Sequence, residues 1–256
     1  MPRAPEDRLP QDKLIVALDV DSLDRAAALV DALHGTARRF KIGSQLFTAA
    51  GPAAIETARK RGFRVFLDLK YHDIPNTVGA AVREATRLGV FMLNIHASGG
   101  LAMARAAAEA ATKAAGEFAM PRPLCVGVTV LTSLDRRALQ REVGVPTSVE
   151  SHVLHLAALA REAGLDGCVA SPQEISPLRL AMGARWVIVT PGIRPAEPVR
   201  MPDRSPLLQK DDQVRIATPR RALAAGADYL VVGRPVSAAK DPAAAAAAIV
   251  AELGAP

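Results

Sequence analysis

The stretch "RVFLDLKYHDIPNTV", residues 64–78, joins a strongly apolar run to a group of charged side chains. Its apolar part does not alternate regularly with polar residues, which predicts a strand buried on both faces, as in a parallel sheet. Asp68, Lys70 and Asp73 stand close together at the end of this run. Buried charges are costly unless they are paired or used, so the stretch predicts a core strand that ends in a functional edge.

Similar short apolar runs recur along the whole chain. They are "LIVAL" (14–18), "RFKIG" (39–43), "VFMLNI" (90–95), "LCVGVTV" (124–130), "GCVA" (167–170), "WVIVT" (186–190) and "YLVVG" (229–233). Segments between them, such as "SLDRAAALVDAL", carry apolar residues at three- and four-residue spacing, which is typical of amphipathic helices. Eight strand–helix units in about 250 residues predict an α/β fold, a single (β/α)8 TIM barrel. A doubly wound open sheet is the alternative.

The chain is expected to form one domain over residues 1–256, because half of its residues are apolar and no Ser/Gly-rich linker divides it. We expect residues 1–12 to be a flexible N-terminal arm. Residues 195–212 are rich in proline and charge without periodicity, which is typical of an active-site lid, here one that closes over phosphate. The Ala-rich segment 242–253 predicts a helix that covers the barrel.

The composition favours a cytoplasmic protein. Residues 1–13 lack the apolar core expected of a signal peptide, and the most apolar tract, "AAAAAAIVA" (243–251), is too short to span a membrane. Cys125 and Cys168 stand in separate apolar runs, which suits a reducing compartment. The net charge of +6 would suit nucleic acid, an anionic small molecule or an arginine-rich surface. With only 4% aromatic residues for base stacking, a basic RNA- or phosphate-binding module has charge alone as support, so we expect neither nucleic acid nor membrane as a partner.

Polar residues follow the predicted strands, where the active face of a TIM barrel is built. They are Asp19, Lys41, Asp68, Lys70, His96, Thr129, Thr132 and Ser171. Residues two apart on a strand share a face, so Asp68 and Lys70 should point the same way, with Lys41 approaching from the neighbouring strand. Two unit charges about 4 Å apart interact by roughly 4 kcal/mol at an effective dielectric near 20. Lys70 is therefore expected to stay protonated, as an acid or a fixed positive charge.

Two loops near the end of the chain predict a phosphate site. "TPGIRP" follows the seventh predicted strand and "VGRP" follows the eighth. Each pairs a glycine, which permits close backbone approach, with an arginine, which can grip phosphate oxygens through two hydrogen bonds. Loops after strands seven and eight bind phosphate in many TIM barrels.

Several motifs together resemble the bacterial orotidine 5′-phosphate decarboxylase family. They are "VALD", "FKIG", "FLDLKYHDIPNTV", "NIHASGG", "VTVLTS", "TPGIRP", "DDQVRIATP" and "VGRPV", in order from Leu14 to about Val236. The resemblance implies a TIM-barrel homodimer that converts orotidine 5′-phosphate to uridine 5′-phosphate and CO2, without metal or organic cofactor. Ser44 and Gln45 depart from the family pattern, at positions outside its charged array.

The resemblance also implies residue roles. Lys70 would donate a proton to the pyrimidine carbon that loses its carboxylate, and Asp68, Asp73 and Lys41 would complete the charged array. Substrate contacts are implied for Asp19, Lys41, Ile74, Thr77, Thr132, Arg194, Gln213, Gly233 and Arg234. Of these, Ile74 and Thr77 would join Asp73 in completing the partner subunit's site. His72 and His96 are interpreted as structural.

Two other enzyme classes fit part of the pattern. A relative of keto-gulonate-phosphate decarboxylase, another phosphosugar enzyme of this barrel class, would share D-x-K-x-x-D but use magnesium. A Schiff-base aldolase would need a neutral lysine, which the neighbouring carboxylates disfavour.

Overall fold

The computed structural model describes residues 9–195 and 215–254, and it is a closed barrel of eight parallel strands. The strands are β1 (Leu14–Ala17), β2 (Arg39–Gly43), β3 (Arg64–Tyr71), β4 (Met92–His96), β5 (Leu124–Val128), β6 (Gly167–Val169), β7 (Val187–Thr190) and β8 (Tyr229–Val232). Each strand pairs with the next along the chain, and β8 pairs with β1. The predicted (β/α)8 barrel and its strands are confirmed, and closure excludes the open sheet.

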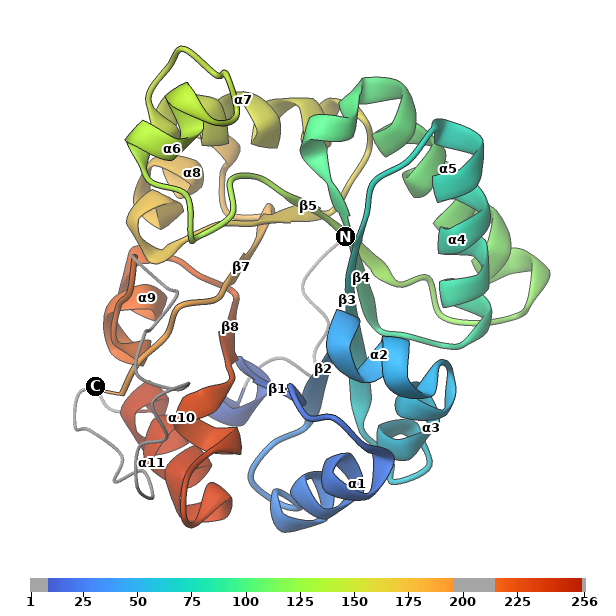
Figure 1. Cartoon of the computed structure of the whole chain (residues 1–256), viewed down its shortest axis with the longest axis vertical. Coiled ribbons are helices and arrows are strands. Elements are labelled where there is room, and N and C mark those ends of the chain that lie inside the picture. Colours follow the sequence, from blue (N-terminus) through green and yellow to red (C-terminus); the bar gives the residue numbers. More distant parts are fainter. Residues whose placement is uncertain (1–8, 196–214, 255–256) are drawn as a thin grey trace.

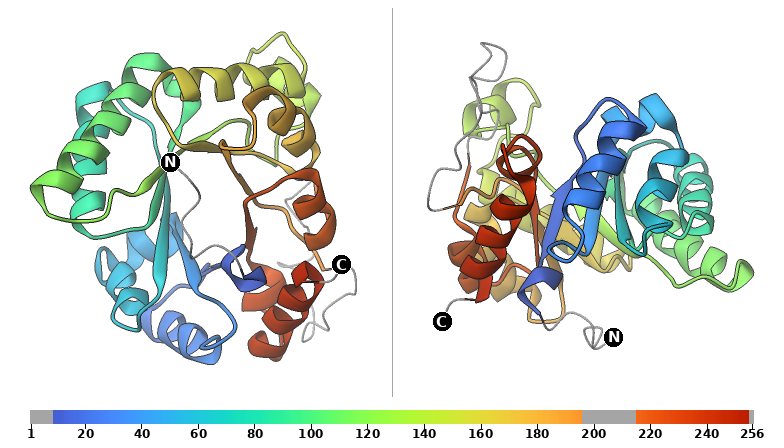
Figure 2. Two further views of the ribbon diagram at one scale, coloured as in Figure 1. Left: turned by 180° about the vertical axis from the view of Figure 1, so that it is seen from behind. Right: turned by 90° about the horizontal axis from the view of Figure 1, so that it is seen from below.

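Helices surround the strands on the outside (Figures 1 and 2). They are α1 (Leu23–Ala32), α2 (Ser44–Ala50), α3 (Ala53–Arg59), α4 (Pro75–Arg87), α5 (Gly100–Glu117), α6 (Arg136–Arg141), α7 (Val149–Glu162), α8 (Ile175–Met182), α9 (Pro219–Ala225), α10 (Arg234–Ser237) and α11 (Pro242–Gly254). Short 3-10 turns occupy η1 (Pro10–Asp12), η2 (Ala97–Gly99) and η3 (Pro172–Glu174). The Ala-rich helix predicted at 242–253 is α11, which packs against η1, α9 and α10.

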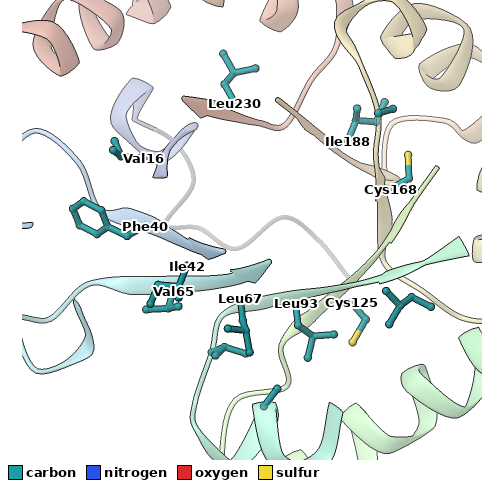
Figure 3. Packing of buried hydrophobic residues seen from close by; sticks show 14 of the residues in the cluster. Val16, Phe40, Ile42, Val65, Leu67, Leu93, Cys125, Cys168, Ile188 and Leu230 are labelled. Carbon is teal, nitrogen blue, oxygen red and sulfur yellow. The ribbon is translucent and has the colours of Figure 1, made fainter. Parts of the chain in front are cut away.

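The strands are buried on both faces, as their unbroken apolar runs predict. Outward residues such as Val16, Phe40 and Leu67 pack between the barrel and its helices (Figure 3). Inward residues, among them Ile15 and Phe66, form a separate cluster inside the barrel. Side chains alternate between the two faces of a strand. A residue that stands an even number of positions from an inward residue therefore also points inward.

Strand β3 departs from this alternation near its end. Leu67 pairs with Leu93 and Tyr71 with Ile95, so β3 carries extra residues in a bulge. Lys70 lies in this bulge with a left-handed φ of 51°, which is uncommon for a residue with a side chain. The bulge re-aims Lys70 at the carboxyl end of the barrel.

The two segments expected to be flexible fall mostly outside the described residues. Residues 1–8 of the expected arm are among the undescribed ones, whereas its last residues form η1, where Asp12 is buried beside Arg39. Residues 196–212 of the expected lid and Gln213 are likewise undescribed, so their roles stay predictions. Within the described part of the chain, no helix combines the length and apolar composition needed to cross a bilayer.

Candidate active site

A cavity of about 750 Å³ opens at the carboxyl ends of the strands. Its apolar floor is formed by inward side chains, namely Ala17, Phe66, Val128, Val169 and Val231. One wall carries the charged residues Asp19, Lys41, Asp68 and Lys70, and the remaining lining includes Thr132, Ser133, Arg194, Gly233 and Arg234. The cavity therefore combines an apolar floor with charged and hydrogen-bonding walls, as small-molecule sites do.

The four charged residues of the wall form an alternating chain. Lys41 Nζ lies 3.0 Å from Asp19 Oδ1 and 3.2 Å from Asp68 Oδ2. Lys70 Nζ lies 2.7 Å from Asp68 Oδ1. The predicted proximity of Asp68, Lys70 and Lys41 is confirmed, and Asp19 joins the same chain.

Burial and charge act in opposite directions on the middle of this chain. Burial disfavours the Lys41 ammonium, but the carboxylates of Asp68 and Asp19 outweigh it and raise the pKa of Lys41 above its ordinary 10.5. Burial likewise opposes ionisation of Asp68, but Lys41 and Lys70 outweigh it and hold the pKa of Asp68 below its ordinary 3.8. Both groups are therefore charged over the physiological pH range.

Asn94 is a site residue that the sequence analysis did not single out. Its amide nitrogen donates to Asp68 Oδ1 at 2.7 Å, and its amide oxygen accepts from the Lys70 backbone N–H at 2.8 Å. A signal was present: Asn94 stands two residues after the inward Met92, between outward Leu93 and Ile95. That alternation assigns Asn94 to the barrel interior.

Asp73, Ile74 and Thr77 lie away from the other predicted site residues. They stand exposed at the start of α4, outside the lining of the cavity, and Ile74 is 66% exposed. Asp73 Oδ1 accepts from the Ile74 N–H at 2.6 Å. Ile74 is extended before Pro75, as the proline predicts. Within one chain these three residues are not part of the charged wall.

The two loops that the sequence predicts to bind phosphate both line the cavity. Arg194, Gly233 and Arg234 all line it. The Arg194 N–H donates to the carbonyl of Ala217 at 2.9 Å, which ties the loop after β7 to the segment before α9. A Cβ at Gly233 would lie 3.3 Å from Asp19 Oδ2, so glycine lets β8 pass close to the charged wall.

Arg215 is a second residue that the sequence analysis did not single out. Its buried guanidinium contacts the carboxylate of Glu174 and donates to the carbonyl of Leu131 at 3.1 Å. Burial raises the pKa of Glu174, and the positive charge of Arg215 offsets only part of that effect. Arg215 thus ties the loops after β5 and β6 together beside the cavity.

His72 and His96 lie side by side near the charged wall. Their ring centroids are 5.3 Å apart. Burial, followed by the positive charges of His72 and Lys70, lowers the pKa of His96.

Among the described residues, no group of three or more His, Cys, Asp and Glu side chains has an arrangement that could hold a metal ion.

Comparisons with known proteins identify the family. The family model described as orotidine 5′-phosphate decarboxylase / HUMPS family matches residues 12–249. An orotidine 5′-phosphate decarboxylase of Moorella thermoacetica is 55% identical over 95% of this chain and 92% of the relative. One from Pseudomonas aeruginosa is 50% identical over 95% of this chain and 98% of the relative.

Solved structures agree with this assignment. The crystal structure of orotidine 5′-phosphate decarboxylase from Lactobacillus acidophilus has a TM-score of 0.79 at 34% identity, covering 94% of this chain and 99% of that one. An uncharacterized conserved protein from Geobacillus kaustophilus has a TM-score of 0.78 at 36% identity, covering 94% of this chain and all of that one. With the match of sequence and fold along nearly its whole length, the chain belongs to the orotidine 5′-phosphate decarboxylase / HUMPS family of enzymes.

Proposed function

We propose that this protein decarboxylates orotidine 5′-phosphate to uridine 5′-phosphate and CO2, the last step in making that pyrimidine nucleotide. The observation that carries the proposal is the chain Asp19, Lys41, Asp68 and Lys70 on the wall of a cavity that also contains two arginines. The names of relatives that are 50–55% identical over nearly the whole chain supply the substrate.

Lys70 is proposed as the proton donor. When the bond between the pyrimidine ring and its carboxylate breaks, CO2 leaves and the electron pair stays on ring carbon C6. The Lys70 ammonium transfers a proton to that carbon, and solvent then returns a proton to the amine. Preorganised positive charge beside the developing carbanion lowers the barrier, because the charge needs no reorganisation during the reaction. The contact of 2.7 Å between Lys70 Nζ and Asp68 Oδ1 holds the amino group on the cavity wall before the reaction.

Asp68, Lys41 and Asp19 are proposed to organise the rest of the charged wall. The Asp68 side chain is 11% exposed and contacts both lysines, so it can fix their positions while facing the departing carboxylate. Asp19 is more open to the cavity, with 48% of its side chain exposed. Its carboxylate and the Lys41 ammonium suit the ribose hydroxyl groups, which both donate and accept hydrogen bonds.

The rest of the cavity lining is proposed to bind the base and the phosphate. Thr132 offers a hydroxyl to the pyrimidine. Arg194 and Arg234 supply positive charge to the phosphate, and Gly233 permits close approach of the backbone. Gln213 is proposed as a further phosphate contact, in a segment proposed to close over the substrate as a lid. Binding of the substrate phosphate by these residues can then help to order the charged wall, where the reaction is proposed to take place.

We further propose that the protein is a homodimer with shared sites. Asp73, Ile74 and Thr77 are exposed and outside the cavity of their own chain, which is where residues that complete a partner's site would stand. An exposed Ile74 beside two polar groups suits a surface that another subunit covers. The free thiols of Cys125 and Cys168 suit the reducing cytoplasm, where we propose that the enzyme works.

An ultraviolet assay with orotidine 5′-phosphate in the presence of a chelator tests the function. We expect the substrate absorbance to fall as uridine 5′-phosphate forms, at the same rate with and without chelator. No turnover at all would overturn the proposal, and activity that required added magnesium would favour the magnesium-dependent relatives. Trapping of substrate on Lys70 by borohydride would instead favour the Schiff-base aldolase.

Mixing two inactive variants tests the shared site. Lys70→Ala and Asp73→Ala should each be inactive alone, and mixed dimers should regain activity because one of their two sites keeps both residues. Mixing Lys70→Ala with Asp68→Ala is the matched control, because both residues act within one chain and no intact site can form. Equal behaviour of the two mixtures, despite proven subunit exchange, would place Asp73 in its own chain's site.

A further inference from the structure

Asn94 occupies a buried position on β4, behind the charged wall. The residue is 1% exposed and is not part of the cavity lining, so it cannot touch a substrate there. Its side chain faces two groups of the wall, the Asp68 carboxylate and the Lys70 backbone. Any effect of Asn94 on the reaction must therefore pass through Asp68 and Lys70.

The hydrogen bonds of Asn94 permit only one orientation of its amide. The Lys70 backbone N–H can only donate, so it needs the amide oxygen, which lies 2.8 Å away. The ionised carboxylate of Asp68 can only accept, so it needs the amide nitrogen, which lies 2.7 Å away. A flipped amide would set donor against donor and acceptor against acceptor. An ionised aspartate, a leucine or an alanine at this position cannot supply both bonds.

The backbone of Lys70 depends on this contact. Lys70 lies in the β3 bulge with φ 51°, a conformation that side chains disfavour and that surrounding contacts must hold. The Asn94 oxygen takes the backbone N–H at this point, so the bulged residue keeps a hydrogen-bond partner. The same amide reaches the carboxylate that the Lys70 ammonium contacts.

Lys70 and Asn94 both donate hydrogen bonds to the same oxygen, Asp68 Oδ1. It accepts from Lys70 Nζ at 2.7 Å and from Asn94 Nδ2 at 2.7 Å. We propose that Asn94 is a positioning residue for the reaction, which sets the bulged backbone of Lys70 and the Asp68 carboxylate with one side-chain amide. This inference rests on the proposed function only in so far as Lys70 is the proton donor.

The substitution Asn94→Asp tests the proposal most sharply. It keeps an oxygen for the Lys70 N–H but sets a second carboxyl group against Asp68. Two carboxyl groups so close share a proton and titrate as a pair with a raised upper pKa. While the pair holds that proton, the introduced group can donate to Asp68 as the amide did. Activity should therefore be highest at low pH and fall as pH rises through that pKa, a limb absent from the unaltered enzyme.

Asn94→Ala removes both hydrogen bonds. We expect kcat to fall on the order of 100-fold, the scale of a small misplacement of a reacting group. KM should change much less, because the residues proposed to hold the phosphate are untouched. Thr86→Val is the matched control: Thr86 is fully buried on α4, and its hydroxyl donates to the carbonyl of Val82 at 2.9 Å. The control should keep kcat and the pH profile of the unaltered enzyme.

A readout without substrate separates this inference from the proposed function. In lysine-selective NMR, the Lys70 side-chain resonance is assigned by its loss in Lys70→Met, and it should shift in Asn94→Ala but not in Thr86→Val. Unchanged kcat, pH profile and Lys70 resonance in the Asn94 variants would overturn the positioning role. If the unaltered protein does not decarboxylate the substrate, the proposed function fails, and the resonance alone decides the role of Asn94. If Asn94→Ala does not fold, the pH profile and resonance of Asn94→Asp decide.

Discussion

At the amino-terminal end of the barrel, Asp166 and Asp228 stand directly before β6 and β8, and each pairs with an arginine. Arg122 Nη1 lies 2.8 Å from Asp166, and Arg179 Nη2 lies 2.7 Å from Asp228. At the carboxyl end, the aspartates Asp19 and Asp68 pair with lysines instead. Both ends therefore pair opposite charges, but the cations are arginines at one end and lysines at the other.

The partners beyond the ion pairs differ as well. Asp166 and Asp228 also accept backbone N–H groups at the start of the preceding neighbour strand, from Cys125 at 2.7 Å and Ile188 at 2.8 Å. Arg179 donates further to backbone carbonyls, including that of Gly226 at 2.6 Å. These charges tie strand to strand through the backbone.

The carboxyl end is built for a different purpose. Its lysines are compact point charges on flexible stems, and both line the cavity. An arginine that donates to several backbone carbonyls stabilises the local structure. An ammonium group on a cavity wall can instead act on a bound molecule. Removing charges at the two ends should therefore separate stability from activity.

The largest expected effect follows from Lys70→Met. Activity should fall by about 10⁴-fold or more, because both the proton donor and its positive charge are lost. The free energy of unfolding should fall little, since Lys70 is partly exposed and strained in φ. The ultraviolet assay and urea unfolding measure the two quantities. Activity within tenfold of the unaltered enzyme would remove Lys70 from the reaction.

Asp228→Ala should have the reverse effect. Removing one partner of a buried ion pair leaves Arg179 and the Ile188 N–H without this carboxylate, and should cost about 3–5 kcal/mol of the free energy of unfolding. The folded fraction should keep its kcat, because the site lies at the other end of the barrel. Urea unfolding measures the loss, with Glu162→Ala on the exposed face of α7 as the control. A loss of kcat with unchanged stability would contradict the division between the two ends.

Arg215 is an arginine at the carboxyl end that contacts a carboxylate and a backbone carbonyl, so Arg215→Met should affect substrate binding more than proton transfer. The change removes the tie between Glu174 and the Leu131 carbonyl, beside the cavity wall that contains Thr132. We expect KM to rise about tenfold with a smaller change in kcat, since binding rather than proton transfer is disturbed. Steady-state kinetics measure this. The double variant Arg215→Met with Glu174→Gln should be more stable than the single one, because it leaves no unpaired buried carboxylate.

The smallest expected effect is on the pH dependence of stability. The folded pKa of Asp68 is lowered, so its contribution is present above the unfolded value near 3.8 and is lost as pH falls through the lower folded pKa. The folded pKa of Lys41 is raised, so its contribution is present below 10.5 and is lost as pH rises through the higher folded pKa. Thermal unfolding across pH should show both limbs. Lys41→Met should remove the alkaline limb and weaken the acid one.

Much of the site could be predicted because strands of a barrel obey strict alternation. Asp19, Lys41 and Asp68 each follow an inward apolar residue by two positions, or lie opposite one, so their common face can be read from the chain. The same rule places Asn94 on the inner face, two residues after Met92. At Lys70 the rule predicts the contact with Asp68 but not the left-handed bulge, because the bulge depends on pairing with β4 that local sequence does not specify.

Other features depend on pairs that lie far apart in sequence. Glu174 and Arg215 are 41 residues apart, and Asp166 and Arg122 are 44 apart, so no local pattern joins them. The part that Asp73 and Ile74 would take in a partner's site is implied by a resemblance rather than by spacing, and it stays a prediction. Contacts between residues that are far apart in sequence arise only when the loops and helices have packed.

By itself, the sequence determined the eight buried strands, their order and the polar residues at their carboxyl ends, because hydrophobic periodicity and turn chemistry are local properties. The tertiary structure decided the actual contacts between these charges. Closing the barrel places Asp19, Lys41 and Asp68 side by side from three strands, and the bulge in β3 turns Lys70 toward Asp68. The physical reason is that ion pairs form between neighbours in space, and only the closed sheet defines those neighbours.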